Sequence, residues 1–220
     1  MEKRSGLILL FVLFCTTVIG QSEEFDPTAD KLDRLILELQ MDRWQETPDG
    51  IELRGYSPGF SVFYMHDYPL LRENLSIAWG IGVSSINVHH NGALIPDSLE
   101  NFIELVPLPD GTEYKKNKTS ATYLDFAAEI RVRTNGDRRL KLMLGARGGA
   151  LVNLHQKFKD DETTVKIRER KFALPYHYGL TARVMFSRVG ISGFYGLSTL
   201  FKDDRSTELY PVSLGIVFSF

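Results

Sequence analysis

The sequence predicts an all-β protein, an eight-stranded antiparallel up-and-down transmembrane β-barrel. Three observations predict it: a short apolar segment near the N-terminus, eight runs in which apolar and polar residues alternate, and a final run that ends on an aromatic residue. In the final run, 208–220, large apolar side chains share one face, because side chains alternate across a strand. They are Tyr210, Val212, Leu214, Ile216, Phe218 and Phe220. This face would contact lipid, and the opposite face, rich in small and polar residues, would line the lumen.

The N-terminal segment has the features of a secretory signal peptide. A charged start with a basic excess precedes an apolar stretch from Leu7 to Ile19, and small or tolerated residues precede Gln21. A membrane-spanning helix needs about 20 apolar residues, and this stretch is shorter. Bulky Phe14 argues against a lipid anchor on Cys15. We therefore expect a signal peptide at 1–20, a short periplasmic lead at 21–32 and the barrel domain at 33–220.

Composition excludes several functions. Cys15 is the only cysteine, so the mature chain would have no disulfide and no thiolate nucleophile. A formal net charge of −2 provides no basic field for nucleic acid, so we expect no nucleic-acid partner. A chain that enters a membrane without a second apolar helix must do so as a closed barrel, in which every backbone polar group is paired. These observations indicate the outer membrane of a Gram-negative bacterium.

Eight runs with a period of two residues are bounded by turn residues, and an even number is what bacterial single-chain barrels require. The second run is the weakest, with a possible bulge at Pro58-Gly59, whereas Asn135-Gly136 is a strong hairpin signal. With both termini in the periplasm, the two longest connections, 89–119 and 154–174, fall on the outside. The predicted strands are 33–44, 51–66, 73–88, 120–134, 138–153, 175–187, 188–201 and 208–220.

The same alternation also fits a secreted soluble β-barrel, in which the faces are reversed and the cavity binds a small apolar ligand. In that alternative Leu124, Leu142 and Leu180 would line the cavity. The polar face mixes Gly, Ser and Ala with single charges. A solvated exterior would carry more Lys, Glu, Asp and Thr, so the composition favours the packed interior of a membrane barrel.

Aromatic residues near strand ends are typical of an interfacial belt in membrane barrels. The candidates are Trp44, Tyr176, Tyr178 and Tyr210. Phe218 and Phe220 at the chain end form a candidate terminal assembly signal, through which the C-terminal strand would contact the barrel-assembly machinery.

Several segments together resemble the small PorT-like outer-membrane β-barrel family of Gram-negative bacteria. The resemblance covers nearly the whole mature chain, from about Asp33 to Phe220. It implies an outer-membrane location, and one branch of that family is associated with a protein-secretion and gliding apparatus. It brings no catalytic residues. The segments that carry it are Asp33 to Leu39, Trp44 with Pro48-Asp49-Gly50-Ile51, Tyr114 to Lys118, Thr122 to Asp125, Tyr178 to Arg183 and Glu208 to Pro211.

Seven charged side chains are predicted to project into the lumen from different strands. An eight-stranded barrel leaves room only for side chains, and buried charges must pair because an isolated ion costs several kcal/mol. We therefore expect a salt-bridge plug, with a narrow gated ion channel as the alternative. The predicted lumen charge network consists of Glu38, Asp42, Asp125, Glu129, Arg131, Arg147 and Arg183.

No spacing of Ser, His and acidic residues matches a catalytic motif, so we expect no enzyme activity and no catalytic residues. His89 and His90 are adjacent and would point to opposite faces of a strand, so we expect neither a metal site nor a cofactor.

The expected partners are the lipid bilayer and lipopolysaccharide. An envelope protein is a further candidate partner at 89–119 and 154–174, since binding loops on a rigid barrel are common. The first of these is unusually apolar, and either folds over the barrel mouth or docks a partner.

Overall fold

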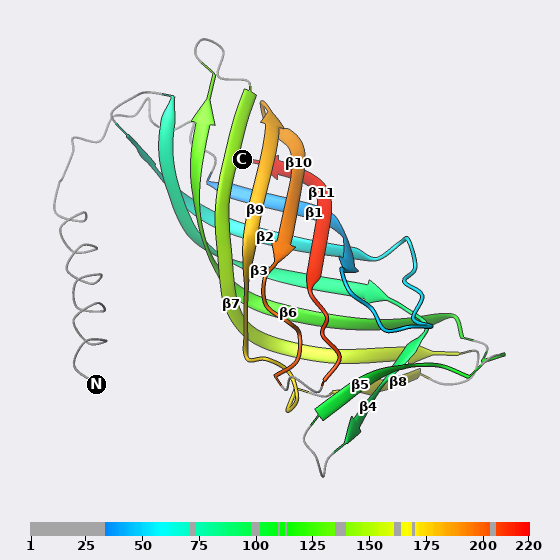
Figure 1. Ribbon diagram of the computed structural model, residues 1–220. Helices are drawn as coiled ribbons and strands as arrows, with labels where there is room; N and C mark the ends of the chain where they lie inside the picture. The colour runs from blue at the N-terminus through cyan, green and yellow to red at the C-terminus, as the bar shows by residue number, and fades with distance from the viewer. Residues whose placement is uncertain are drawn as a thin grey trace, which may run out of the picture. The chain divides into compact units, whose positions relative to one another are not determined.

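Eight strands of the computed structural model form a closed antiparallel ring (Figure 1). Each strand pairs with its neighbours around the ring, and β1 closes it by pairing with β11 from Ile36 with Ser219 to Trp44 with Pro211. The fold is therefore the predicted eight-stranded up-and-down barrel. Its strands are β1 (Leu35–Trp44), β2 (Pro58–Pro69), β3 (Leu75–His89), β6 (Lys116–Arg133), β7 (Leu140–Lys159), β9 (Tyr176–Phe186), β10 (Val189–Gly196) and β11 (Pro211–Ser219).

The structure describes residues 34–70, 74–97, 102–109, 111–112, 114–134, 140–160, 164–168, 170–202 and 206–220. These residues belong to one compact unit, Asp33–Phe220. The predicted signal peptide at 1–20 and the lead at 21–32 lie outside the described residues, as does the hairpin turn predicted at Asn135-Gly136. Across the described ranges, no helix has both the length and the apolar character needed to cross a bilayer.

The second strand begins later than predicted. β2 starts at Pro58 rather than at residue 51, and Leu53 makes only an isolated bridge with His90. Where β2 is missing, the Asp42 carboxylate accepts a hydrogen bond of 2.7 Å from the backbone N–H of Asn87, so a side chain replaces the absent strand. The bulge predicted at Pro58-Gly59 is wrong. The register shifts instead between Thr122 and Tyr123 of β6, where Val152 of β7 is unpaired.

The two segments expected to be long loops contain further strands. β4 (Gly92–Asp97) and β5 (Phe102–Pro107) form a hairpin, and β8 (Thr164–Ile167) pairs with the far end of β7. Figure 1 shows the long strands β6 and β7 running beyond the ring toward β4, β5 and β8, at the end away from the C-terminus. We call this the outer end, because outer-membrane barrels carry their long connections outside and short turns in the periplasm. At the opposite end, the Ser187-Arg188 turn is tight, with Ser187 at a φ of 57°.

The two faces of the strands follow the predicted alternation. Leu124, Leu142 and Leu180 point outward and are 55%, 42% and 53% exposed, so the soluble barrel with these residues in its cavity is wrong. Most outward positions of the ring strands carry exposed apolar side chains, including Trp79, Ile130 and Ile216. An outward apolar face and a polar, packed interior are the arrangement that a bilayer requires.

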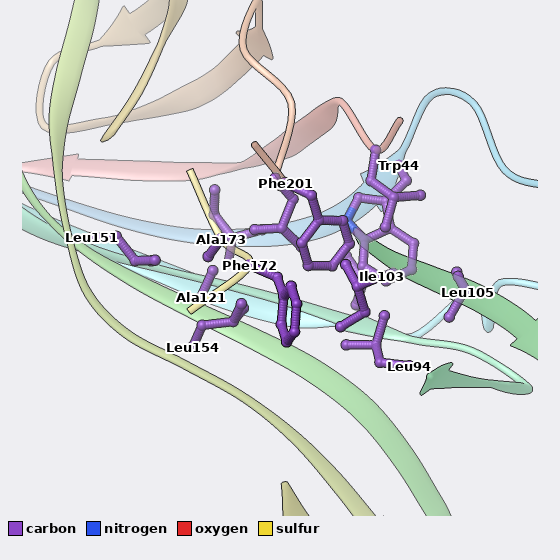
Figure 2. Close-up of a cluster of buried hydrophobic side chains, with 14 of the residues drawn as sticks. Trp44, Leu94, Ile103, Leu105, Ala121, Leu151, Leu154, Phe172, Ala173 and Phe201 are labelled. Atoms are coloured by element: carbon purple, nitrogen blue, oxygen red, sulfur yellow. The ribbon is translucent and has the colours of Figure 1, made fainter. Parts of the chain in front are cut away.

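The interior has layers of different chemistry. At the inner end, a small apolar cluster is formed by Ile36, Phe63, Met65, Ala78, Ala127, Met143, Met185 and Val217. Charged side chains lie along the same faces of these strands. At the outer end, a larger apolar cluster joins Trp44, Ala121 and Leu154 of the ring to Leu94, Ile103 and Leu105 of the hairpin (Figure 2). We call it the outer cluster.

Candidate functional site: the lumen and the outer end of the barrel

Charged side chains of alternating sign form a continuous chain through the lumen. Strand alternation turns them inward, and the register of β1, β2, β6, β7 and β9 brings them together. The order of contacts is Arg133, Asp67, Arg131, Glu129, Arg183, Glu38 and Arg147, each paired with the next. We call this the lumen chain. All seven side chains are at most 7% exposed.

Apart from the longer contact between Arg147 and Glu38, the contacts in the lumen chain have the geometry of charge-assisted hydrogen bonds. The Arg131 guanidinium lies 3.0 Å from Asp67 Oδ2 and 2.7 Å from Glu129 Oε1. Arg183 donates from Nε to Glu38 Oε1 at 2.8 Å and from Nη1 to Glu129. Each of these carboxylates thus contacts two guanidinium groups, which offsets the cost of removing the charges from water.

Arg147 is the outermost cation of the chain. Its Nη1 lies 3.6 Å from Glu38 Oε2 and donates to Ser61 Oγ at 3.2 Å. Its guanidinium also lies 3.8 Å from the centroid of the Phe194 ring, a cation–π arrangement. Phe194 belongs to the outer cluster, so Arg147 joins the charged layer to the apolar layer above it.

Two of the predicted lumen carboxylates have other partners. Asp42 accepts hydrogen bonds from Ser213 Oγ at 2.6 Å and from the Asn87 N–H. Asp125 accepts from Ser84 Oγ at 2.6 Å and lies 2.6 Å from His177 Nε2. The structure thus brings five of the seven predicted residues into the lumen chain and places Asp42 and Asp125 beside it.

Ser84, Asp125 and His177 do not have the geometry of a nucleophilic triad. The carboxylate stands between the serine and the histidine, so the imidazole is not placed to take the serine proton. His177 is stacked on Tyr123 with ring centroids 3.8 Å apart, which fixes the imidazole in the wall. In the part of the chain that the structure describes, no three His, Cys, Asp or Glu side chains are grouped to hold a metal ion.

Sequence reasoning missed Asp67, Arg133 and His177 as members of this interior. Asp67 lies one residue beyond the predicted end of the second strand, whereas β2 continues to Pro69. Arg133 and His177 have the inward phase of their strands, so alternation carried a signal for both. Their partners depend on the register between strands, which a single sequence does not give.

The β4–β5 hairpin closes the outer end of the lumen. Leu94 N–H donates to Gln156 Oε1 at 3.0 Å, and Gln156 Nε2 donates to Gly92 O at 2.8 Å. On the other side, the N–H groups of Ile103 and Leu105 donate to Ser206 and Thr207 side chains at 3.1 and 2.9 Å. With its backbone held at both sides, the hairpin buries Leu94, Ile103 and Leu105, which are at most 4% exposed. The apolar segment therefore covers the mouth.

His90 supports the start of the hairpin. Its Nδ1 accepts from the Gly92 N–H at 3.1 Å, so Nε2 carries the proton and faces Thr119 Oγ1 at 2.9 Å. Burial and the neighbouring His89 lower the pKa of His90 to about 4. Within the outer cluster, side chains that include Trp44 and Ala121 line a cavity of about 10 Å³, room for about one water molecule.

The predicted interfacial aromatics divide into two groups. The prediction for Trp44 is wrong: it is 5% exposed and lies inside, with its ring centroid 5.1 Å from that of His90. Trp44 has the same strand phase as Glu38 and Asp42 and therefore points inward. Tyr176 and Tyr178 point outward and are 52% and 49% exposed, and Tyr210 is partly exposed. Phe218 pairs with Leu37 in the closing seam, and Phe220 is 61% exposed.

An open groove of about 450 Å³ runs beside the hairpin. The hairpin contributes Glu104 to Pro107, and the facing walls come from 46–48 and 206–208. Three carboxylates line it: Glu46, Glu104 and Glu208. This side of the outer end is acidic, in contrast to the β6–β8 side described below.

The closed ring, the outward apolar face and the filled interior define an outer-membrane β-barrel protein. Residues 36–202 match the family described as outer membrane protein beta-barrel domain, and the chain belongs to this family. Its location is accordingly the outer membrane of a Gram-negative bacterium. Comparison with curated proteins found no match.

Two solved structures are similar to this chain. Both are of Ail, the attachment invasion locus protein of Yersinia pestis, one of them in complex with the heparin analogue sucrose octasulfate. Their sequence identities are 18% and 16%, with TM-scores of 0.37 and 0.34. Each alignment covers 84% of this chain and 96% of the Ail chain.

Proposed function

We propose that this protein is a non-conducting outer-membrane barrel with a structural or interaction role, accessory to a protein-secretion or envelope-assembly machine. The observation that carries the proposal is the filled lumen. The lumen chain occupies the inner part, and the outer cluster with its hairpin covers the mouth. A barrel whose described side chains fill the lumen in this way acts through its surfaces, and the proposal includes no catalytic step.

The outer end offers a surface of the kind that binds proteins. Among the residues that the structure describes, β8 is the last strand of the sheet and pairs only with β7, which leaves its other edge open to them. All four of its side chains are exposed, including Val165 at 43% and Ile167 at 38%. An open edge binds a strand of another protein by β-augmentation. The envelope partner expected at 89–119 and 154–174 would dock on this edge.

Two further partners follow from the same architecture. The bilayer surrounds the apolar face, with lipopolysaccharide in its outer leaflet. The C-terminal strand, with Phe218 and Phe220, is the segment that the barrel-assembly machinery would receive before β11 pairs with β1. The resemblance of segments such as Tyr178 to Arg183 to PorT-like barrels supports an assignment to secretion rather than to transport.

Photo-crosslinking in living cells tests the proposal. A photoreactive phenylalanine analogue replaces Val165 on β8 or, as the control, Val189, which is 48% exposed at the other end of the barrel. We expect one envelope protein, identified by mass spectrometry, to be captured from position 165 and again from position 167, but not from 189. Equal capture from 165 and 189, or capture of lipid alone from all three, would contradict a partner-binding role.

A further inference from the structure

A row of basic side chains crosses the outer ends of β3, β6, β7 and β8, which we call the outer extension of the sheet. His89 of β3 is paired in register with Lys118 of β6, Lys118 with Lys157 of β7, and Lys157 with Lys166 of β8. Arg54 continues the row, since its N–H donates to His89 O at 2.9 Å. Residues directly opposite each other on neighbouring strands project to the same face. We call these five residues the basic row.

The basic row lies on the outward face of the extension. On β6, Asn117 and Thr119 point inward and are at most 2% exposed, so Lys118 between them points outward. The next outward pair along the same strands is again basic, Lys116 with Lys159. The whole sequence has 26 Lys and Arg against 28 Asp and Glu, so this concentration is local.

The described residues do not compensate the lysines of the row. His89, at the buried end of the row, is uncharged at neutral pH, because burial and the nearby Lys116, Lys118 and Arg54 lower its pKa to about 4. Lys118 Nζ donates to Asn87 Oδ1 at 2.7 Å, but no described carboxylate pairs with Lys116, Lys118, Lys157 or Lys166. Like charges directly opposite each other on neighbouring strands destabilise a sheet. The pKa of Lys118 is lowered, first by burial and then by the positive charges of Lys116, Lys157 and Lys166. The lysines of the row therefore repel one another. An anion bound across the row would remove this repulsion.

The height of the basic row above the apolar belt indicates which anion would meet it. Leu124 is the last strongly exposed apolar residue on the outward face of β6, and Lys118 lies six residues beyond it. At about 3.3 Å per residue and a strand tilt of about 40°, the row stands about 15 Å above this residue. Polar Thr122 and Ser120 fill the interval. The row thus faces sideways, at the level of the phosphorylated headgroup and inner sugars of lipopolysaccharide in the same leaflet.

We propose that the basic row is a binding site for the phosphate groups of lipopolysaccharide, with Lys118, Lys157 and Lys166 as the main donors. A lysine ammonium binds phosphate as a point charge, and clusters of several cations bind anionic headgroups cooperatively. The row lies on the lipid-facing side of the strands, so one lipopolysaccharide molecule can contact the apolar belt with its acyl chains and the row with its phosphates. This inference rests on the lipopolysaccharide contact in the proposed function, but it does not depend on the partner proposed for the β8 edge.

The test is a titration of the full-length protein in detergent with fluorescent lipopolysaccharide. The test variant carries Lys118→Gln, Lys157→Gln and Lys166→Gln. The matched control carries Lys171→Gln, Lys202→Gln and Arg188→Gln, which remove the same charge from exposed positions elsewhere. We expect the test variant to bind about ten-fold or more weakly and the control within about two-fold of the native protein. Equal binding by the two variants would overturn the proposal.

Two further arms use the native protein, so they do not depend on the folding of a variant. Enzymatically dephosphorylated lipopolysaccharide should bind as weakly as the test variant binds the intact lipid, and salt should weaken only the intact lipid. If the dephosphorylated lipid binds equally well, phosphate is not the ligand. Inorganic phosphate and a soluble polyphosphate test whether the bound phosphate groups belong to a membrane lipid or to a soluble compound. Binding of either in preference to lipopolysaccharide would overturn the assignment to the membrane lipid.

Discussion

Cations inside the barrel and cations on its outer extension have opposite surroundings. In the lumen, Arg131 and Arg183 each contact two carboxylates. On the extension, Lys157 lies between Lys118 and Lys166. Interior charges must be compensated within the fold because their desolvation is not otherwise offset. Surface charges are screened by water or by a ligand. The closed interior thus accounts for stability, whereas binding is expected at the lysines of the basic row, with which no described carboxylate pairs.

Breaking the lumen chain should have the largest effect. Arg183→Leu removes the shared partner of Glu38 and Glu129, and we expect the free energy of unfolding to fall by about 4 kcal/mol, since removing one member of a buried pair strands the other. Urea-induced unfolding in lipid vesicles measures it. Arg188→Leu, at an exposed turn position, is the control and should change stability by less than about 1 kcal/mol. Equal effects of the two would show that the chain is not a structural unit.

Disturbing the outer cluster should have a smaller and more local effect. Ile103→Asp places a carboxylate at a position that is 0% exposed, and we expect the hairpin to lose about 3 kcal/mol of docking free energy. Protease cleavage within the hairpin should then be about a hundred-fold faster, because it follows the open population. Ile95→Asp, on the same hairpin but 53% exposed, should leave the rate nearly unchanged. Equally fast cleavage of both variants would argue against a docked lid.

A third change tests Asp42, whose carboxylate bonds to the Asn87 N–H beyond the start of β2. In Gly59→Ala the new Cβ would overlap the Asp42 carboxylate and lie 2.7 Å from Ser85 O. Asp42 would then lose its bonds to Asn87 and Ser213, and we expect a loss of about 2 kcal/mol in the free energy of unfolding. Gly193→Ala is the control, since its Cβ meets nothing closer than 3.9 Å. A Gly59→Ala protein as stable as the control would show that the carboxylate has no such role.

The smallest effect is that of pH on the hairpin. The pKa of His90 is lowered to about 4 from 6.5, so its stabilising contribution is complete above pH 6.5 and is lost as the pH falls from 6.5 towards 4. We expect hairpin docking to weaken by about 1 kcal/mol at pH 5.5, because a proton on Nδ1 would face the Gly92 N–H. Hydrogen exchange at the hairpin amides measures it. The pKa of the neighbouring His89 is also lowered to about 4, so His89→Asn is the matched control. His90→Asn should reduce the pH dependence of docking and His89→Asn should leave it, and the reverse result would assign the dependence to His89.

The fold was predictable because alternation is a local property. The inward phase of Glu38, Glu129 and Arg183 follows from a period of two in each strand. The same phase should have placed Trp44 inside, but its position near a strand end favoured an interfacial assignment. Asp67 was missed because the end of a strand is less marked in a sequence than its alternation.

Contacts between distant strands were not predictable in the same way. The lumen chain and the basic row depend on register, which sets the height of each side chain relative to its neighbours. His89, Lys118, Lys157 and Lys166 are widely spaced in the sequence and meet only because β3, β6, β7 and β8 are consecutive in the sheet. The apolar segment around Ile103 had two possible roles, and the hydrogen bonds to Ser206 and Thr207 decide between them.

The most direct test of the central claim, that the lumen is closed, is the conductance of the purified full-length protein in planar bilayers. With the lumen chain filling the inner part and the hairpin over the mouth, we predict no discrete current steps at any applied voltage that the bilayer tolerates. Uniform, reproducible openings whose ion selectivity changes in Arg183→Leu would contradict the account and establish the gated channel instead.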